Sequence, residues 1–112
     1  MGGTSTIETL YANDFKYYAN KQRDYENEHY TPFIDDDDNL NLCLSDVFNN
    51  IVTALEDPES VTEPSLRLLL AEIRCLLDGR VEDPYWAFKD SELEAVVEDL
   101  RLVEGIIDRR IR

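Results

Sequence analysis

Apolar residues recur every three or four positions along most of the chain, which is the spacing of one face of an α-helix. The pattern is clearest between residues 40 and 55, where one stripe is formed by Leu40, Leu44, Val47, Phe48, Ile51, Val52 and Leu55. Similar stripes run through residues 7–19, 66–77 and 93–111. No stretch alternates apolar and polar residues between turn signals, as a half-buried strand would. The pattern therefore predicts helices and no sheet.

Capping boxes mark the first and last helices. Ser5 and Ser91 each precede a Glu by three residues, an arrangement that satisfies free backbone N–H groups at a helix start. We therefore expect a first helix over about residues 5–29 and a last helix from residue 90 or 91 to 111. Pro32 supports the end of the first helix, because the residue before a proline avoids the helical conformation.

Two further helices are expected in the middle of the chain. Asp38 or Asn39 is expected to cap the second, over about residues 40–55. Thr62 is expected to cap the third, which ends at Gly79 because glycine readily adopts the left-handed conformation that closes a helix.

A short fifth helix is expected near residues 84–88, after Asp83. The connections between the expected helices are short, which favours antiparallel neighbours. The predicted fold class is therefore all-α: one acidic domain spanning residues 1–112, built as a compact bundle of four main helices plus the short helix near 84–88.

Acidic residues concentrate in one window of the sequence. From Asp24 to Leu66 the chain has twelve Asp or Glu and no Lys or Arg, and the run Asp35-Asp36-Asp37-Asp38 lies within it. The formal net charge is −14. This charge argues against direct binding of nucleic acid or an anionic membrane, because both need clustered Lys and Arg. It favours a basic protein as partner, while the alternative is that the acidity serves only solubility.

Few residues offer chemistry. His29, the one histidine, lies among acids and is expected on the surface. Cys43 and Cys75 fall in apolar helical runs and are expected as free core thiols, with a disulfide as the alternative. Residues 35–41 echo the spacing of a calcium loop, but Leu40 stands where that loop needs glycine. With no phosphate loop or nucleophile motif either, we expect no enzyme, no metal and no cofactor.

Two aromatic groups have both a core and a surface interpretation. The first lies between Tyr11 and Tyr25, where core packing is the favoured interpretation and a tyrosine contact surface the alternative. In the second, Phe88 is expected in the core. For Tyr85 and Trp86, burial and contact with a partner are equally favoured.

Size, charge, helicity and lack of chemistry together resemble the small acidic immunity proteins that neutralise bacterial nuclease toxins in bacteriocin and contact-dependent inhibition systems. The residues that carry the resemblance are Asp35, Asp36, Asp37, Asp38, Asp46, Glu56, Asp57, Glu59, Asp83, Tyr85 and Trp86. The resemblance implies a surface of these residues that occludes the active site of a cognate basic nuclease. It also implies a cytoplasmic protein that is a monomer or weak dimer.

Two other functions remain open at this stage. One is a phage-type inhibitor of host defence that mimics DNA with spaced carboxylates. The concentration of acids in one window, with eight Lys or Arg after Leu66, counts mildly against it. The other is a structural or adaptor subunit that buries Tyr and Leu surface in an assembly. No signal peptide and no apolar run long enough for a membrane helix is recognised in the sequence.

Overall fold

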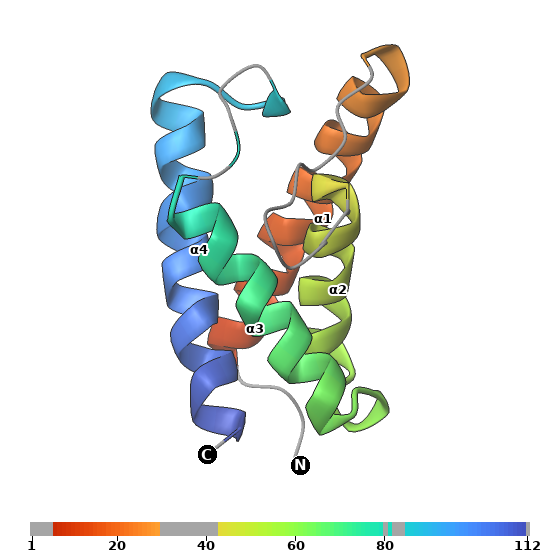
Figure 1. Cartoon of the computed structure of the whole chain (residues 1–112), viewed down its shortest axis with the longest axis vertical. Coiled ribbons are helices and arrows are strands. Elements are labelled where there is room, and N and C mark those ends of the chain that lie inside the picture. Colours follow the sequence, from red (N-terminus) through yellow and green to blue (C-terminus); the bar gives the residue numbers. More distant parts are fainter. Residues whose placement is uncertain (1–5, 30–42, 80, 82–84, 112) are drawn as a thin grey trace.

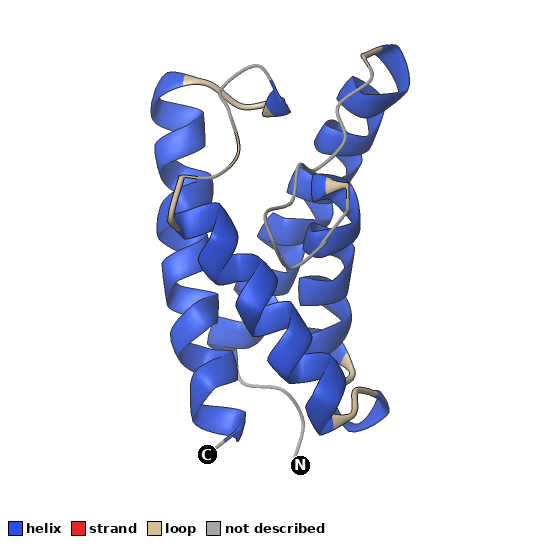
Figure 2. Cartoon of the chain, viewed as in Figure 1, coloured by secondary structure: helices blue, strands red, loops and turns tan. Residues whose placement is uncertain are grey.

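The computed structural model describes residues 6–29, 43–79, 81 and 85–111. They form four helices and one short 3-10 turn: α1 (Thr6–Glu28), α2 (Leu44–Glu56), η1 (Pro58–Ser60), α3 (Glu63–Leu77) and α4 (Asp90–Ile111). No strand occurs among the described residues (Figure 2). The all-α helical bundle expected from the apolar stripes is confirmed.

The helices pack mainly as two pairs, α1 against α2 and α3 against α4. In Figure 1, α3 runs diagonally between the lower end of α2 and the middle of α4, and it contacts both helices. The molecule measures 42 × 29 × 21 Å along its principal axes.

An aromatic cluster joins α1, α2 and the segment before α4. Phe15 and Tyr18 of α1 meet edge to face at 5.2 Å between ring centroids, and Tyr18 meets Phe88 at 5.5 Å. Phe48 of α2 lies 6.4 Å from the Trp86 ring. Aromatic pairs at these separations stabilise a core beyond the area that they bury. The core interpretation is confirmed for Phe88, Phe15 and Tyr18, whereas Tyr17 is 53% exposed.

Local capping signals fix both ends of α3. The Thr62 side chain accepts a hydrogen bond from the Ser65 backbone N–H at 3.3 Å. At the other end Gly79 has φ of +75°, and its N–H reaches the Leu76 carbonyl at 3.2 Å. The predicted cap at Thr62 and stop at Gly79 are both confirmed, because these signals need no partner elsewhere in the chain.

The predicted start of the second helix is wrong. It begins at Leu44 rather than near residue 40, and Cys43 occupies the cap position without a side-chain hydrogen bond. The missing cap is supplied by α1. The Glu26 carboxylate accepts from the Ser45 backbone N–H at 3.1 Å and from the Ser45 hydroxyl at 2.5 Å. A carboxylate suits this place because it complements the positive end of the helix dipole.

The prediction of a short helix that continues through residue 88 is also wrong. Tyr85 has 3-10 geometry, but residues 86–89 are not helical. Gln22, fully buried in α1, explains the difference. Its amide donates to the Tyr85 carbonyl at 2.9 Å and accepts from the Ala87 N–H at 2.9 Å. These backbone groups are thus paired with α1 instead of with a local helical turn.

The start of α4 at Asp90 is confirmed, but the capping box at Ser91 is not formed because Ser91 already lies inside the helix. Burial corrects two further expectations. Leu10, which lies within the apolar stripe expected over residues 7–19, is 58% exposed. Cys43 is exposed and is therefore not a core residue, whereas Cys75 is half-buried, and the two cysteines form no disulfide. His29 is exposed as expected.

Candidate protein-binding surface

The partner-binding residues expected from the sequence divide between the two ends of α2. Asp35 to Asp38 and Asp83 lie outside the described residues. Asp46 lies in the first turn of α2, and Glu56 is its last residue. Ten residues of helix separate them by about 15 Å along the axis. The described residues of the set that are exposed or half-buried therefore form two groups rather than one patch: three acids at one end, and Asp46 with Tyr85 at the other.

The first group surrounds η1. Glu56, Asp57 and Glu59 are all exposed there. Glu56 forms an ion pair with Lys16 of α1, with 2.5 Å between Nζ and Oε2. No Lys or Arg among the described residues pairs with Asp57 or Glu59. Two carboxylates at this end therefore remain uncompensated.

The second group lies at the start of α2. Asp46 is exposed and forms only a long ion pair with Arg23, at 3.9 Å. Tyr85 is half-buried, and the Gln22 amide binds its backbone carbonyl. Through Gln22 and Glu26, which are hydrogen-bonded at 3.2 Å, the Tyr85 segment and the start of α2 are held at the same end of α1.

Trp86 is not part of this surface. It is 4% exposed, and its Nε1 donates to the Val81 carbonyl at 3.4 Å. The sequence left open whether Trp86 is buried or contacts a partner, and the structure shows that it is buried in the core. Its assignment as a partner contact is therefore corrected. The aromatic character of residues 85–88 serves packing, and only Tyr85 retains exposed area.

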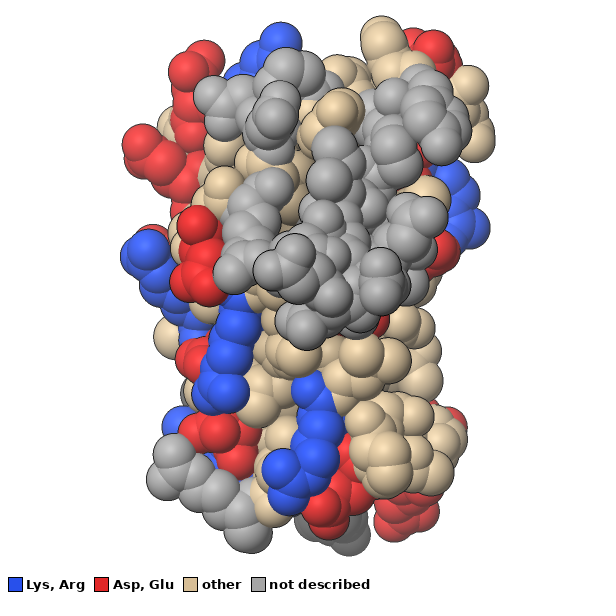
Figure 3. Space-filling view, in the orientation of Figure 1, with Lys and Arg blue, Asp and Glu red and all other residues tan. Residues whose placement is uncertain are grey.

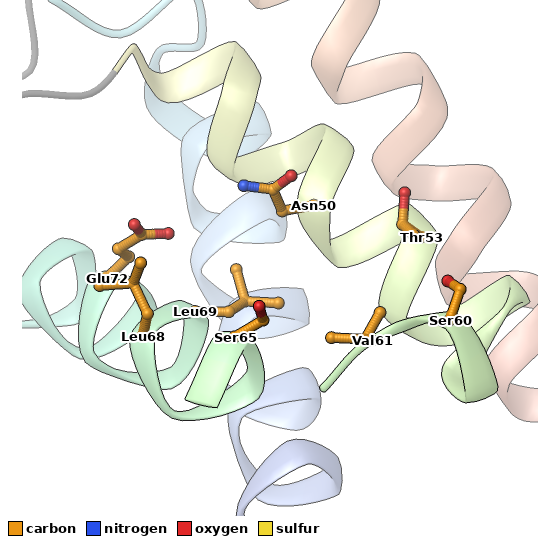
Figure 4. A pocket seen from close by; sticks show the side chains of 8 residues that line it. All are labelled: Asn50, Thr53, Ser60, Val61, Ser65, Leu68, Leu69 and Glu72. Carbon is orange, nitrogen blue, oxygen red and sulfur yellow. The ribbon is translucent and has the colours of Figure 1, made fainter. Parts of the chain in front are cut away.

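A pocket of about 260 Å³ opens between α2 and α3. Its lining comes from both helices and from the η1 connection: Asn50, Thr53, Ser60, Val61, Ser65, Leu68, Leu69 and Glu72. Figure 4 shows the Asn50 and Glu72 side chains reaching toward the same end of the pocket from α2 and α3. At the other end lie Ser60 and Val61 (Figure 4). The pocket thus has a polar end and a partly apolar wall.

Glu72 is the unusual group of this pocket. It is 2% exposed, and no cation or hydrogen-bond donor among the described residues pairs with its carboxyl. Burial raises the pKa of Glu72 from its ordinary 4.5 to about 7, and the nearby Asp46 carboxylate acts in the same direction. A buried carboxyl without a partner is costly when ionised.

The arginines of α3 are engaged by other acids. Arg67 pairs with Glu63 one turn earlier, at 2.9 Å. Arg74 pairs with Glu104 and Asp108 of α4, at 2.8 and 3.4 Å. Figure 3 shows Lys and Arg side chains lying beside Asp and Glu over this side of the molecule. Both arginines of α3 therefore pair with other carboxylates and not with Glu72.

The sequence carries a signal for Glu72. Leu69, Ile73 and Leu76 lie on the buried stripe of α3, and Glu72 falls between them at helical spacing. A carboxylate on a buried stripe is uncommon and marks either an internal partner or a site. The capping role of Glu26 and the linking role of Gln22 carried no comparable signal, since both act on residues far along the chain.

The described residues contain no group of three or more His, Cys, Asp or Glu side chains placed to hold a metal ion. His29 stacks on Tyr25 at 4.4 Å between ring centroids. None of the described helices is both long and apolar enough to cross a membrane. Comparisons with protein-family models, with curated proteins and with solved structures find no match to this chain.

Proposed function

We propose that this protein binds a cognate basic nuclease toxin and inhibits it by occluding its active site. The observation that supports this is the surplus of exposed carboxylates in the folded protein. Exposed acids without a Lys or Arg partner among the described residues include Asp14, Asp24, Glu28, Asp57, Glu59, Asp78, Asp90, Glu94 and Glu98. Most described cations are meanwhile already in ion pairs.

Unpaired carboxylates give the folded protein a strong negative field. Such a field steers a positively charged protein toward it and raises the association rate. A nuclease must carry a basic cleft, because it neutralises the phosphates of its substrate. An acidic protein that covers this cleft excludes the substrate without any chemistry of its own.

The two acidic groups at the ends of α2 fit beneath a single partner. A protein–protein interface of ordinary size buries about 800 Å² on each side, a patch about 30 Å across. The ends of α2 are about 15 Å apart. Asp46 and Tyr85 at one end, and Glu56, Asp57 and Glu59 at the other, then border an interface whose centre is the pocket between α2 and α3.

Capture of the partner tests this function. The tagged full-length chain is incubated with nuclease-treated lysate of its source at low salt, and proteins released at high salt are purified. Each is assayed for cleavage of DNA and RNA with and without the chain. We expect a basic protein whose nuclease activity disappears at an equimolar ratio. If no released protein is a nuclease that the chain inhibits, the proposal is overturned.

A second candidate function has an observation of its own. Asp90, Glu94 and Glu98 are exposed, and they repeat every four residues along α4, about 6 Å apart. Such a row of carboxylates suits a mimic of the DNA backbone that inhibits a DNA-binding defence enzyme. Replacing all three by Gln separates the two functions. Weaker binding after this change favours the mimic, and weaker binding after Asp57→Lys and Glu59→Lys favours the nuclease inhibitor.

A further inference from the structure

None of the described residues that line the pocket between α2 and α3 carries a positive charge. Its Glu72 carboxyl is almost fully buried and has no partner among the described residues. The charged group that faces it from α2 is Asp46, another carboxylate, and Arg67 and Arg74 of its own helix are held by acids elsewhere. A cation that entered the pocket would meet an acceptor already stripped of water, where an ion pair is worth more than on the surface.

The rest of the lining suits a long side chain with a charged end. The volume of about 260 Å³ lies below the range of pockets for drug-sized ligands, and it fits a single side chain. Leu68 and Leu69 offer apolar contact for an aliphatic stem, and Leu68 is 49% exposed at the edge. The Asn50 amide makes no hydrogen bond to the described residues and lies near the same end as Glu72 (Figure 4).

We propose that this pocket binds an arginine side chain of the basic partner, whose guanidinium pairs with Glu72 and Asn50 while its methylene stem lies along Leu68. Arginine fits better than lysine because its planar fork offers several donors to several acceptors and is more weakly hydrated. This inference rests on the proposed function for the partner's identity. The chemistry of the pocket itself is independent of that partner.

A small arginine compound tests the pocket without any partner. N-acetylarginine methylamide is titrated into the full-length protein, and the amide signals of residues around the pocket are followed by NMR. The uncharged analogue N-acetylcitrulline methylamide has the same shape. We expect saturable shifts at Asn50, Leu68 and Leu69 with the arginine compound and none with citrulline. At saturation the pKa of the Glu72 carboxyl, read by ¹³C NMR, should fall.

Two matched variants, each of which removes one negative charge, test where the arginine compound binds. Glu72→Gln takes the charge from inside the pocket, and Glu28→Gln takes it from the exposed end of α1. The first should weaken arginine binding about tenfold or more, and the second less than about twofold. Equal binding of citrulline, or equal effects of the two variants, would overturn the proposal.

The result is separable from that of the partner capture. Arginine binding at Glu72 together with failure to find an inhibited nuclease would overturn the proposed function and keep the arginine pocket. If the protein inhibits a nuclease, Glu72→Gln leaves its affinity for that nuclease unchanged, and the arginine compound does not bind, the proposed function is kept and the arginine pocket is overturned.

Discussion

Replacing Glu72 by Gln should make the protein more stable, and only at neutral and alkaline pH. Burial, aided by Asp46, raises the pKa of Glu72 to about 7 in the folded protein, against an ordinary 4.5. Between these values the folded protein keeps a proton that the unfolded chain releases. The free energy of unfolding therefore falls as pH rises through this window, and it levels off above it.

The size of the effect follows from the two pKa values. Each pKa unit corresponds to about 1.4 kcal/mol, so the shift to about 7 costs the ionised protein about 3 kcal/mol at pH 8. The amide that replaces the carboxyl in Glu72→Gln cannot ionise, so the variant does not carry this cost. Asp99, whose pKa burial raises to about 6, contributes equally to both proteins and cancels in the comparison.

Urea unfolding measures the difference. Trp86 is the one tryptophan of the chain and is buried, so its fluorescence reports unfolding. The gap in unfolding free energy between Glu72→Gln and the parent should widen by about 3 kcal/mol between pH 4 and pH 8. Glu59→Gln, which removes the same charge from an exposed turn, should show no such change. A gap that is the same at both pH values for Glu72→Gln would refute the reasoning.

Three other substitutions test the contacts that hold the bundle together. Gln22→Ala should lower the free energy of unfolding by about 2–3 kcal/mol, because it removes a buried partner of two backbone groups; urea unfolding measures this. Arg110→Ala should cost about 1–3 kcal/mol by the same measurement, since its guanidinium binds both the Ala54 carbonyl at 2.7 Å and the Glu8 carboxylate. Tyr18→Phe should raise the pKa of Asp99 above about 6, because the hydroxyl that donates to this carboxylate opposes the effect of burial; ¹³C NMR measures it.

Gln22→Ala and Arg110→Ala each have a matched control, and each of the three predictions has a result that would contradict it. Asn20→Ala and Arg109→Ala change exposed residues of the same helices and should alter stability by less than about 0.5 kcal/mol. An effect of Gln22→Ala or Arg110→Ala no larger than that of its control would contradict the described contacts. An unchanged or lower pKa of Asp99 in Tyr18→Phe would show that the hydroxyl does not stabilise the carboxylate.

Features that depend on neighbouring residues were predictable from the sequence. The cap at Thr62 and the stop at Gly79 act within one turn of α3, so the bounds of that helix follow from local chemistry. The apolar stripes likewise predict the number of main helices, because burial of one face is what stabilises a helix in a small domain.

Features that depend on contacts across the chain were not predictable. The start of α2 is set by Glu26, which lies nineteen residues before its hydrogen-bond partner Ser45, and the path of residues 85–88 is set by Gln22, more than sixty residues earlier. Trp86 is buried beside Phe48 of α2, far from it in sequence, so its sequence neighbours could not decide between core and surface. Glu72 is the exception, since its place on a buried stripe can be recognised in the sequence, whereas the pocket beside it cannot.

The most direct test of the central claim is the residual activity of the captured basic nuclease when it is titrated with this protein. The protein should abolish cleavage at an equimolar ratio. A variant with Asp35 to Asp38 changed to Lys should inhibit less well and with a weaker dependence on salt. Full nuclease activity in the presence of excess parent protein would contradict the claim. Equal inhibition by the lysine variant would exclude that acidic run from the interface.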